Sequence, residues 1–357
     1  MAFAISPAAL ETHAATLTTL SEAVAKADAY ANEHLTIELV DTSFTFAGVI
    51  GDCQRVLDAL LLLQQDLAGA LGASATELSG TASRSRDLDD ALEAQLDSAY
   101  PGEIDPSAHQ SVPTGRAVYM TPSAPADSLT TPVDDGVEDL VSQILGGDWL
   151  SPSYWVTEIM DLVLSWNPVE VVSKNFSGNW NALFTYESAL ANLGRFHKAQ
   201  GDGIGYAMSV TANTWEGEAA EAANIFFTSM ASSARASGDD LVRIAPEFAI
   251  LARAMKTTGD NIGGLLRSAM DAIIVAAVIY AAGVATSATG VGAIIAAAGG
   301  SAALVTAVVL LDKAWDAVSG VMAIVGALSM AIEFFSTYDV NQSVYSKPIP
   351  YDNPTVN

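Results

Sequence analysis

The stretch TANTWEGEAA, residues 211–220, separates two long segments in which apolar side chains recur in steps of three, four and seven. Such steps place the apolar residues along one face of a helix. At the bend, Trp215 can close the end of the apolar stripe, and Gly217 tolerates turn dihedrals beside the indole. Asn213 or Thr214 is expected to cap the second helix. The sequence therefore predicts a helical hairpin that reverses at Trp215. Its stripes are Phe176, Trp180, Leu183, Leu190, Leu193, Phe196, Ile204 and Met208 upstream, and Ala219, Ala223, Phe226, Met230, Ala234, Leu241, Ala245, Phe248, Ala252 and Met255 downstream.

A second hairpin without the Trp-x-Gly turn is predicted nearer the N-terminus. Residues 8–40 and 46–98 carry the same apolar periodicity, with a turn expected at 41–43. Neither hairpin can hide its own stripe, so we expect residues 8–98 and 170–270 to pair within one chain. The predicted fold class is all-α: long antiparallel helical hairpins forming a four-helix-bundle-like core, followed by an apolar helical region.

Composition divides the chain into five parts. The N-terminal hairpin occupies residues 1–100, and a Pro/Ser-rich linker or loosely ordered loop with six of the thirteen prolines occupies 101–136. The Trp-x-Gly hairpin follows in 137–271, led by short helices at 137–146 and 152–165. Gly/Ala-rich apolar helices are expected in 272–335 and an extended polar tail in 336–357.

Two interruptions are expected inside the Trp-x-Gly hairpin. Pro246 lacks an amide donor and should kink the second helix or end it near Ala245. The run Gly201-Asp202-Gly203-Ile204-Gly205 follows no strand, so it predicts a flexible break in the first helix rather than a phosphate-binding loop.

Motif, hairpin and apolar tail together resemble the WXG family of type VII secretion substrates, small helical hairpins that carry Trp-x-Gly at the turn. The run Trp166-Asn167-Pro168 and the Gly/Ala-rich region after the second helix are similar to the extended actinobacterial members. The resemblance covers roughly residues 166–335. It implies a secretion substrate or effector scaffold that contacts a helical partner or a second copy of itself, and a secretion-system ATPase.

The family's export signal is Tyr-x3-Asp/Glu, and of the ten tyrosines only Tyr154 fits, with Glu158 one helical turn later. This pair is the candidate secretion signal. In the family the signal follows the hairpin, whereas here it precedes the Trp-x-Gly turn. An ordinary amphipathic helix remains the alternative interpretation, and a separate partner could then carry the export signal.

Charge and composition exclude several functions. The formal net charge of −26 disfavours binding to nucleic acid. Cys53 is the only cysteine; its place in an apolar stripe predicts a buried, inert thiol. The four histidines are far apart in sequence, and no nucleophile elbow or Walker loop is present. We expect no enzyme activity, no cofactor and no metal, with a packing role for His13 and His197.

Residues 272–311 contain no charged side chain, and 40 such residues exceed the length that crosses a bilayer. Small residues at close spacing equally suit helix packing, so both tight packing and membrane insertion of 272–335 stay open. The sequence starts without a recognisable secretory leader. The expected localisation is cytoplasmic before export, then secreted or at the cell surface. A membrane-inserting, pore-forming effector is the alternative function.

Overall fold

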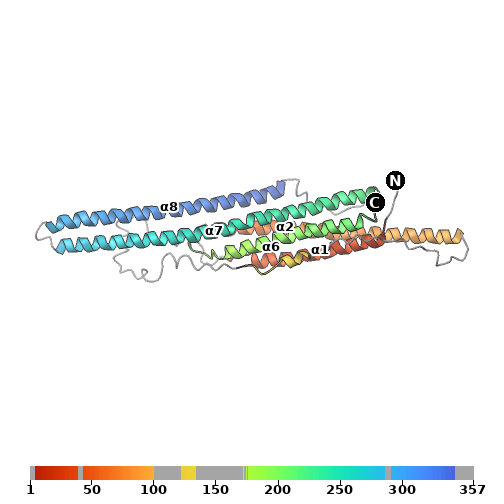
Figure 1. The fold of residues 1–357 in the computed structure, drawn as a ribbon, viewed down its shortest axis with the longest axis horizontal. Coiled ribbons are helices and arrows are strands. Elements are labelled where there is room, and N and C mark those ends of the chain that lie inside the picture. The colour runs from red at the N-terminus through yellow and green to blue at the C-terminus, as the bar shows by residue number, and fades with distance from the viewer. Residues whose placement is uncertain are drawn as a thin grey trace.

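The computed structural model describes residues 5–38, 43–99, 122–133, 172, 174, 176–285 and 291–341. These residues form long helices and contain no β-strand, which confirms the all-α prediction. The elements are α1 (Pro7–His34), α2 (Phe44–Ala99), the short 3-10 helix η2 (Pro125–Ser128), α6 (Ala182–Thr211), α7 (Glu218–Ala285) and α8 (Val291–Asn341). Together they build an elongated rod, in which α7 and α8 extend past the ends of α1 and α6 (Figure 1).

The two hairpins pair within the chain, as predicted. α1 and α2 are antiparallel, as are α6 and α7, and their inward faces share one apolar core. Hydrogen bonds join the hairpins along the core: the Tyr186 hydroxyl donates to the Cys53 carbonyl at 2.9 Å, and the Gln200 amide donates to the Leu20 carbonyl at 2.8 Å. The largest fully buried side chains include Trp180, Tyr186, Phe46, Phe176, Phe196, Phe227 and Phe248.

Glycines let α6 and α7 approach closely. A Cβ placed on Gly201 would lie 2.5 Å from the Ala231 carbonyl oxygen, and one placed on Gly238 would lie 2.5 Å from the Gly194 carbonyl oxygen. The predicted flexible break at residues 201–205 is therefore wrong, because α6 is continuous from Ala182 to Thr211. These glycines serve contact between helices rather than local flexibility.

α7 also continues through Pro246, so of the two predicted outcomes the end of the helix near Ala245 is wrong, while a kink at the proline stays a prediction. The proline ring lies on the exposed face, while Ala245, Phe248 and Ala249 on either side of it are buried. A proline inside a helix costs about 3 kcal/mol. Burial of the neighbouring side chains, at about 25 cal/mol per Å² of apolar surface, outweighs that cost and keeps the helix intact.

α8 folds back antiparallel to α7 and reaches α2 with its C-terminal half (Figure 1). The Thr45 hydroxyl lies 3.3 Å from the Met322 sulfur, and the Ser329 hydroxyl donates to the buried carboxylate of Asp52. The helix continues to Asn341, so the extended tail expected from Ser336 does not begin there.

Candidate functional site

The Trp-Glu-Gly turn lies where α6 and α7 reverse the chain. α6 ends at Thr211 and α7 begins at Glu218. Only 3% of the surface of Trp215 is exposed, although Thr214 and Glu216 on either side of it are exposed. Its indole closes the end of the core between the two helices, as a large apolar side chain at a bundle end does.

Gly217 supplies the backbone conformation of this turn. Its φ of +117° lies in the region that residues with a Cβ rarely adopt. The Glu221 amide donates to the Gly217 carbonyl at 3.1 Å, which makes Gly217 the N-cap residue directly before α7. The turn therefore combines one buried ring with one glycine conformation.

The predicted cap of α7 by Asn213 or Thr214 is wrong. The Asn213 side chain donates to the Ser209 carbonyl at 3.1 Å, and the Thr214 hydroxyl donates to the Thr211 carbonyl at 3.2 Å. Both side chains thus satisfy carbonyls at the C-terminal end of α6, where four acceptors lack helical partners.

Beside the turn, His13 of α1 joins both helices of the second hairpin. Its Nδ1 lies 3.0 Å from the Thr211 hydroxyl of α6, and its ring centroid lies 4.6 Å from that of Phe227 in α7. The ring is 1% exposed, and burial lowers the pKa of His13 to about 4. At neutral pH the imidazole is uncharged and packs as a core residue.

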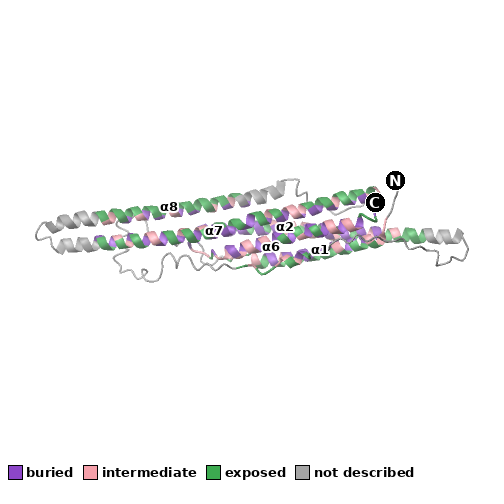
Figure 2. Cartoon of the chain, viewed as in Figure 1, coloured by how far each residue is buried: buried purple, intermediate pink, exposed green. Residues whose placement is uncertain are grey.

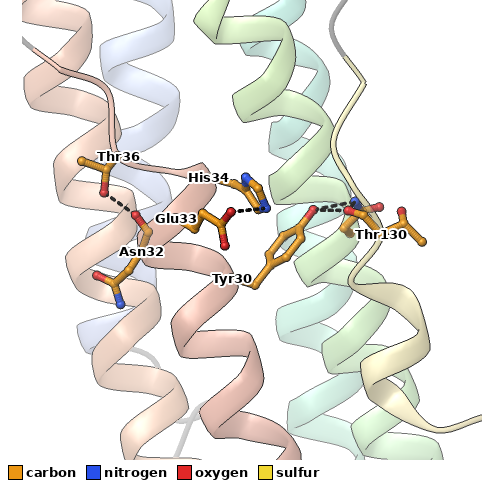
Figure 3. Close-up of polar contacts among 7 residues, drawn as sticks. Tyr30, Asn32, Glu33, His34, Thr36 and Thr130 are labelled. Atoms are coloured by element: carbon orange, nitrogen blue, oxygen red, sulfur yellow. Dashed lines mark hydrogen bonds and ion pairs between the residues drawn. The ribbon is translucent and has the colours of Figure 1, made fainter.

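A second polar contact ties part of the Pro-rich segment to the bundle. Tyr30 reaches from α1 towards Thr130, and its hydroxyl donates to the Thr130 carbonyl at 2.7 Å (Figure 3). The Asn192 amide of α6 donates to the same carbonyl at 2.9 Å and to the Tyr30 hydroxyl at 2.7 Å. Pro125 is buried in the same segment. Residues 122–133 of the expected linker are therefore docked along α1 and α6.

One residue in the sequence could have signalled this contact, although it is not part of the apolar periodicity. Asn192 is polar and stands beside Leu190 and Leu193 of the apolar stripe, yet it is 1% exposed. A buried amide needs hydrogen-bond partners. The partners, Tyr30 and Thr130, are distant in sequence and could not be named from it.

Cys53 has the buried position that its stripe predicts, with 1% exposure. Burial raises the pKa of its thiol far above the usual range, with a smaller contribution from the neighbouring Asp52 carboxylate. The thiol is protonated and shielded.

The outer surface of α8 carries large apolar side chains. Figure 2 shows extensive exposed surface along this helix. Exposed fractions are 62% for Val305, 47% for Trp315 and 67% for Met330. A helix that is apolar all round is normally covered on every side, so this surface is a candidate docking site. The exposed large apolar residues of α8 are Val305, Val308, Val309, Trp315, Met322, Ile324 and Met330.

Several other predictions concern residues that the structure does not describe. Tyr154 and Glu158 lie outside the described residues, as do Trp166 and the short helices expected at 137–146 and 152–165. In the part of the chain that the structure describes, no three histidine, cysteine or carboxylate side chains are placed to hold a metal ion. Among those same residues, no helix has both the length and the apolar character needed to span a bilayer.

Comparison with models of protein families, with curated proteins and with solved structures gives no match to this chain.

Proposed function

We propose that the chain is a type VII secretion substrate or effector scaffold that acts by helix-to-helix interaction rather than by catalysis. One observation carries this proposal: Trp215 is buried at the reversal between two long antiparallel helices, with Gly217 at positive φ. A Trp-x-Gly turn in that position is what the resemblance to the WXG family implies. The proposed localisation is cytoplasmic before export and secreted or cell-surface afterwards.

The proposed partner is a helical protein or a second copy of the chain. In this protein the N-terminal hairpin already covers the inward stripes of α6 and α7, as the bond from Tyr186 to Cys53 illustrates. The outer face of α8, with Val305, Val308 and Met330, is the apolar surface left for a partner. Burial of such side chains contributes about 25 cal/mol per Å² of apolar area.

Export is tested by comparing culture supernatants from strains with and without the secretion ATPase. The chain should accumulate outside the cell only when the ATPase is present, whereas a cytoplasmic marker protein should stay inside in both strains. Tyr154→Ala and Glu158→Ala variants test the candidate signal, with Tyr206→Ala as a matched tyrosine control in α6. Equal extracellular amounts from the two strains would contradict the proposal.

A second candidate function, insertion of residues 272–335 into a target membrane, is favoured by one observation. Ile274, Val275, Val305 and Val309 expose about half or more of their surface on α7 and α8. Leakage of a dye from liposomes between pH 4 and pH 7 tests this function. Intact liposomes at every pH would exclude this second function. Leakage caused by the purified chain alone, without the secretion ATPase, would favour it over the first proposal.

A further inference from the structure

Two buried histidines lie in the apolar core that the two hairpins share. His13 of α1 meets Thr211 and Phe227 of the second hairpin. His197 of α6 is fully buried, and neither of its ring nitrogens has a hydrogen-bond partner. The Nε2 atom of His13 likewise has none. His13 therefore lies at the seam between the hairpins, and the position of His197 follows from the alignment of α2 with α6.

The alignment of α2 with α6 identifies what lies opposite His197. These helices are parallel: Tyr186 of α6 bonds to the Cys53 carbonyl, and Trp180, just before α6, packs edge-on against Phe46, which are offsets of 133 and 134 residues. The same offset places Gln64 of α2 level with His197. The Gln64 side chain is also fully buried, and neither its amide nitrogen nor its oxygen has a partner. The seam thus holds a layer of unsatisfied polar groups, each costly to bury.

Among the residues that the structure describes, no charged side chain pairs with either imidazole, and burial is the one cause that lowers both pKa values. The carboxylates and cations level with the two histidines lie on outer faces of the helices, exposed or half-buried. Several are already paired, such as Lys198 with Asp239 and Arg86 with Glu11. Near His197 they are Glu22, Lys26 and Asp28 of α1, Asp66 of α2, Arg195, Lys198 and Asp202 of α6, and Arg235, Asp239 and Asp240 of α7; near His13 they are Glu11 of α1, Glu77, Arg84 and Arg86 of α2, and Glu218 and Glu221 of α7.

We propose that His13 and His197 make the contact between the hairpins acid-sensitive, so that the N-terminal hairpin separates from the α6–α7 hairpin on mild acidification. Protonation places a positive charge in the apolar seam at two levels. Separation of the hairpins returns both rings to water without melting the helices that carry them. The apolar stripes of both hairpins then become available to other surfaces.

The direction of the pH dependence follows from burial. Burial lowers the pKa of each histidine from 6.5 to about 4, so the open chain binds more protons than the closed one between these values. The stability of the closed bundle is full above about pH 6.5 and is lost as the pH falls towards 4. Between pH 8 and pH 5 the shift favours opening roughly 30-fold per histidine, or about 900-fold for both.

Two other kinds of carboxyl group titrate in acid, and neither hides the pH range in which the histidines act. Burial raises the pKa of the partly exposed Asp28 carboxyl, which therefore favours the closed form slightly as the pH falls. Exposed carboxylates protonate mainly below about pH 4.3. The histidine effect should thus dominate between about pH 6 and 4.5.

The test uses the full-length chain in acid titrations followed by a dye that binds apolar surface and by far-ultraviolet circular dichroism. We expect dye binding to rise between pH 6 and 4.5 while helicity is retained. In the His13→Gln/His197→Gln double variant the rise should move at least one pH unit lower. His34→Gln, on a partly exposed histidine at the end of α1, should titrate like the parent chain.

If the double variant is not helical at pH 8, His13→Asn and His197→Met provide a second neutral pair. Coincident titrations of the parent and the neutral variants would overturn the proposal. So would a parent chain that stays closed throughout this range, or one whose helicity falls together with the rise in dye binding. Export plays no part in this experiment, so its outcome is independent of the proposed secretion role.

Discussion

Replacement of Gly201 by alanine tests whether the glycines of α6 allow its close contact with α7. The new Cβ would lie 2.5 Å from the Ala231 carbonyl oxygen, 2.7 Å from the Arg235 Cγ and 3.1 Å from the Arg235 amide nitrogen. Two of these three atoms belong to the backbone of α7, which cannot rotate away as a side chain can. Ordinary contact begins near 3.4 Å, so α7 must move by about 0.9 Å at this level.

The magnitude follows from two opposing effects. Overpacking a well-packed interface costs about 1–3 kcal/mol, and the backbone contacts of Gly201 favour the upper end. Alanine gains about 1 kcal/mol over glycine in helix propensity. The net loss for Gly201→Ala is therefore about 2 kcal/mol. Gly264→Ala in α7 is the matched control, because no atom lies within 4 Å of its added Cβ. This variant should gain about 1 kcal/mol.

The assay is urea unfolding of both variants and the parent chain at neutral pH, followed by circular dichroism. We expect the two variants to differ by about 3 kcal/mol, with the parent between them. Gly238→Ala, which faces the Gly194 carbonyl oxygen at 2.5 Å, should resemble Gly201→Ala. If Gly201→Ala and Gly264→Ala are equally stabilised, the close approach of α6 and α7 is refuted.

Trp215→Ala should lower the free energy of unfolding by about 3–5 kcal/mol in a thermal or urea melt, since it removes a buried indole; Trp315→Ala, half exposed on α8, is the matched control and should lose far less. Tyr186→Phe should cost about 1 kcal/mol through loss of the bond to the Cys53 carbonyl, and an unchanged urea midpoint would contradict that contact. The Cys53 thiol should resist a thiol reagent at pH 8 and react once urea unfolds the chain, because burial raises its pKa and blocks access. Rapid labelling of the folded chain would contradict its burial.

The sequence was sufficient for the helices and for their pairing, because both follow from local periodicity. Stripes such as Leu183, Leu190 and Leu193 recur at helical spacing, and two amphipathic hairpins in one chain each need a cover. Two of the predictions that failed, a break at Gly201 and a helix end near Pro246, treated propensity as decisive. Contacts between helices override propensity at both positions, and those contacts are not visible in a linear pattern.

The polar contacts could not be predicted from the sequence for a related reason. Tyr30 and Asn192 are separated by 162 residues, and the bond between them exists only because the two hairpins pair in one register. The same register places Gln64 level with His197. The Tyr154–Glu158 export signal stays a prediction, since it lies outside the described residues.

The distribution of charge gives α8 a further property relevant to docking. Residues 251–341 contain four basic and six acidic residues, so they carry only −2 of the net charge of −26. The acidic remainder of the chain repels other acidic proteins, including other copies of the chain, but such repulsion is screened beyond about 8–10 Å in physiological salt. α7 is 68 residues long against 30 for α6, so the α7–α8 hairpin continues past the α6 end of the bundle. Among the described residues, the exposed apolar face of α8 therefore lies in a part of the chain with little net charge, so like-charge repulsion opposes association there less than along the acidic N-terminal hairpin.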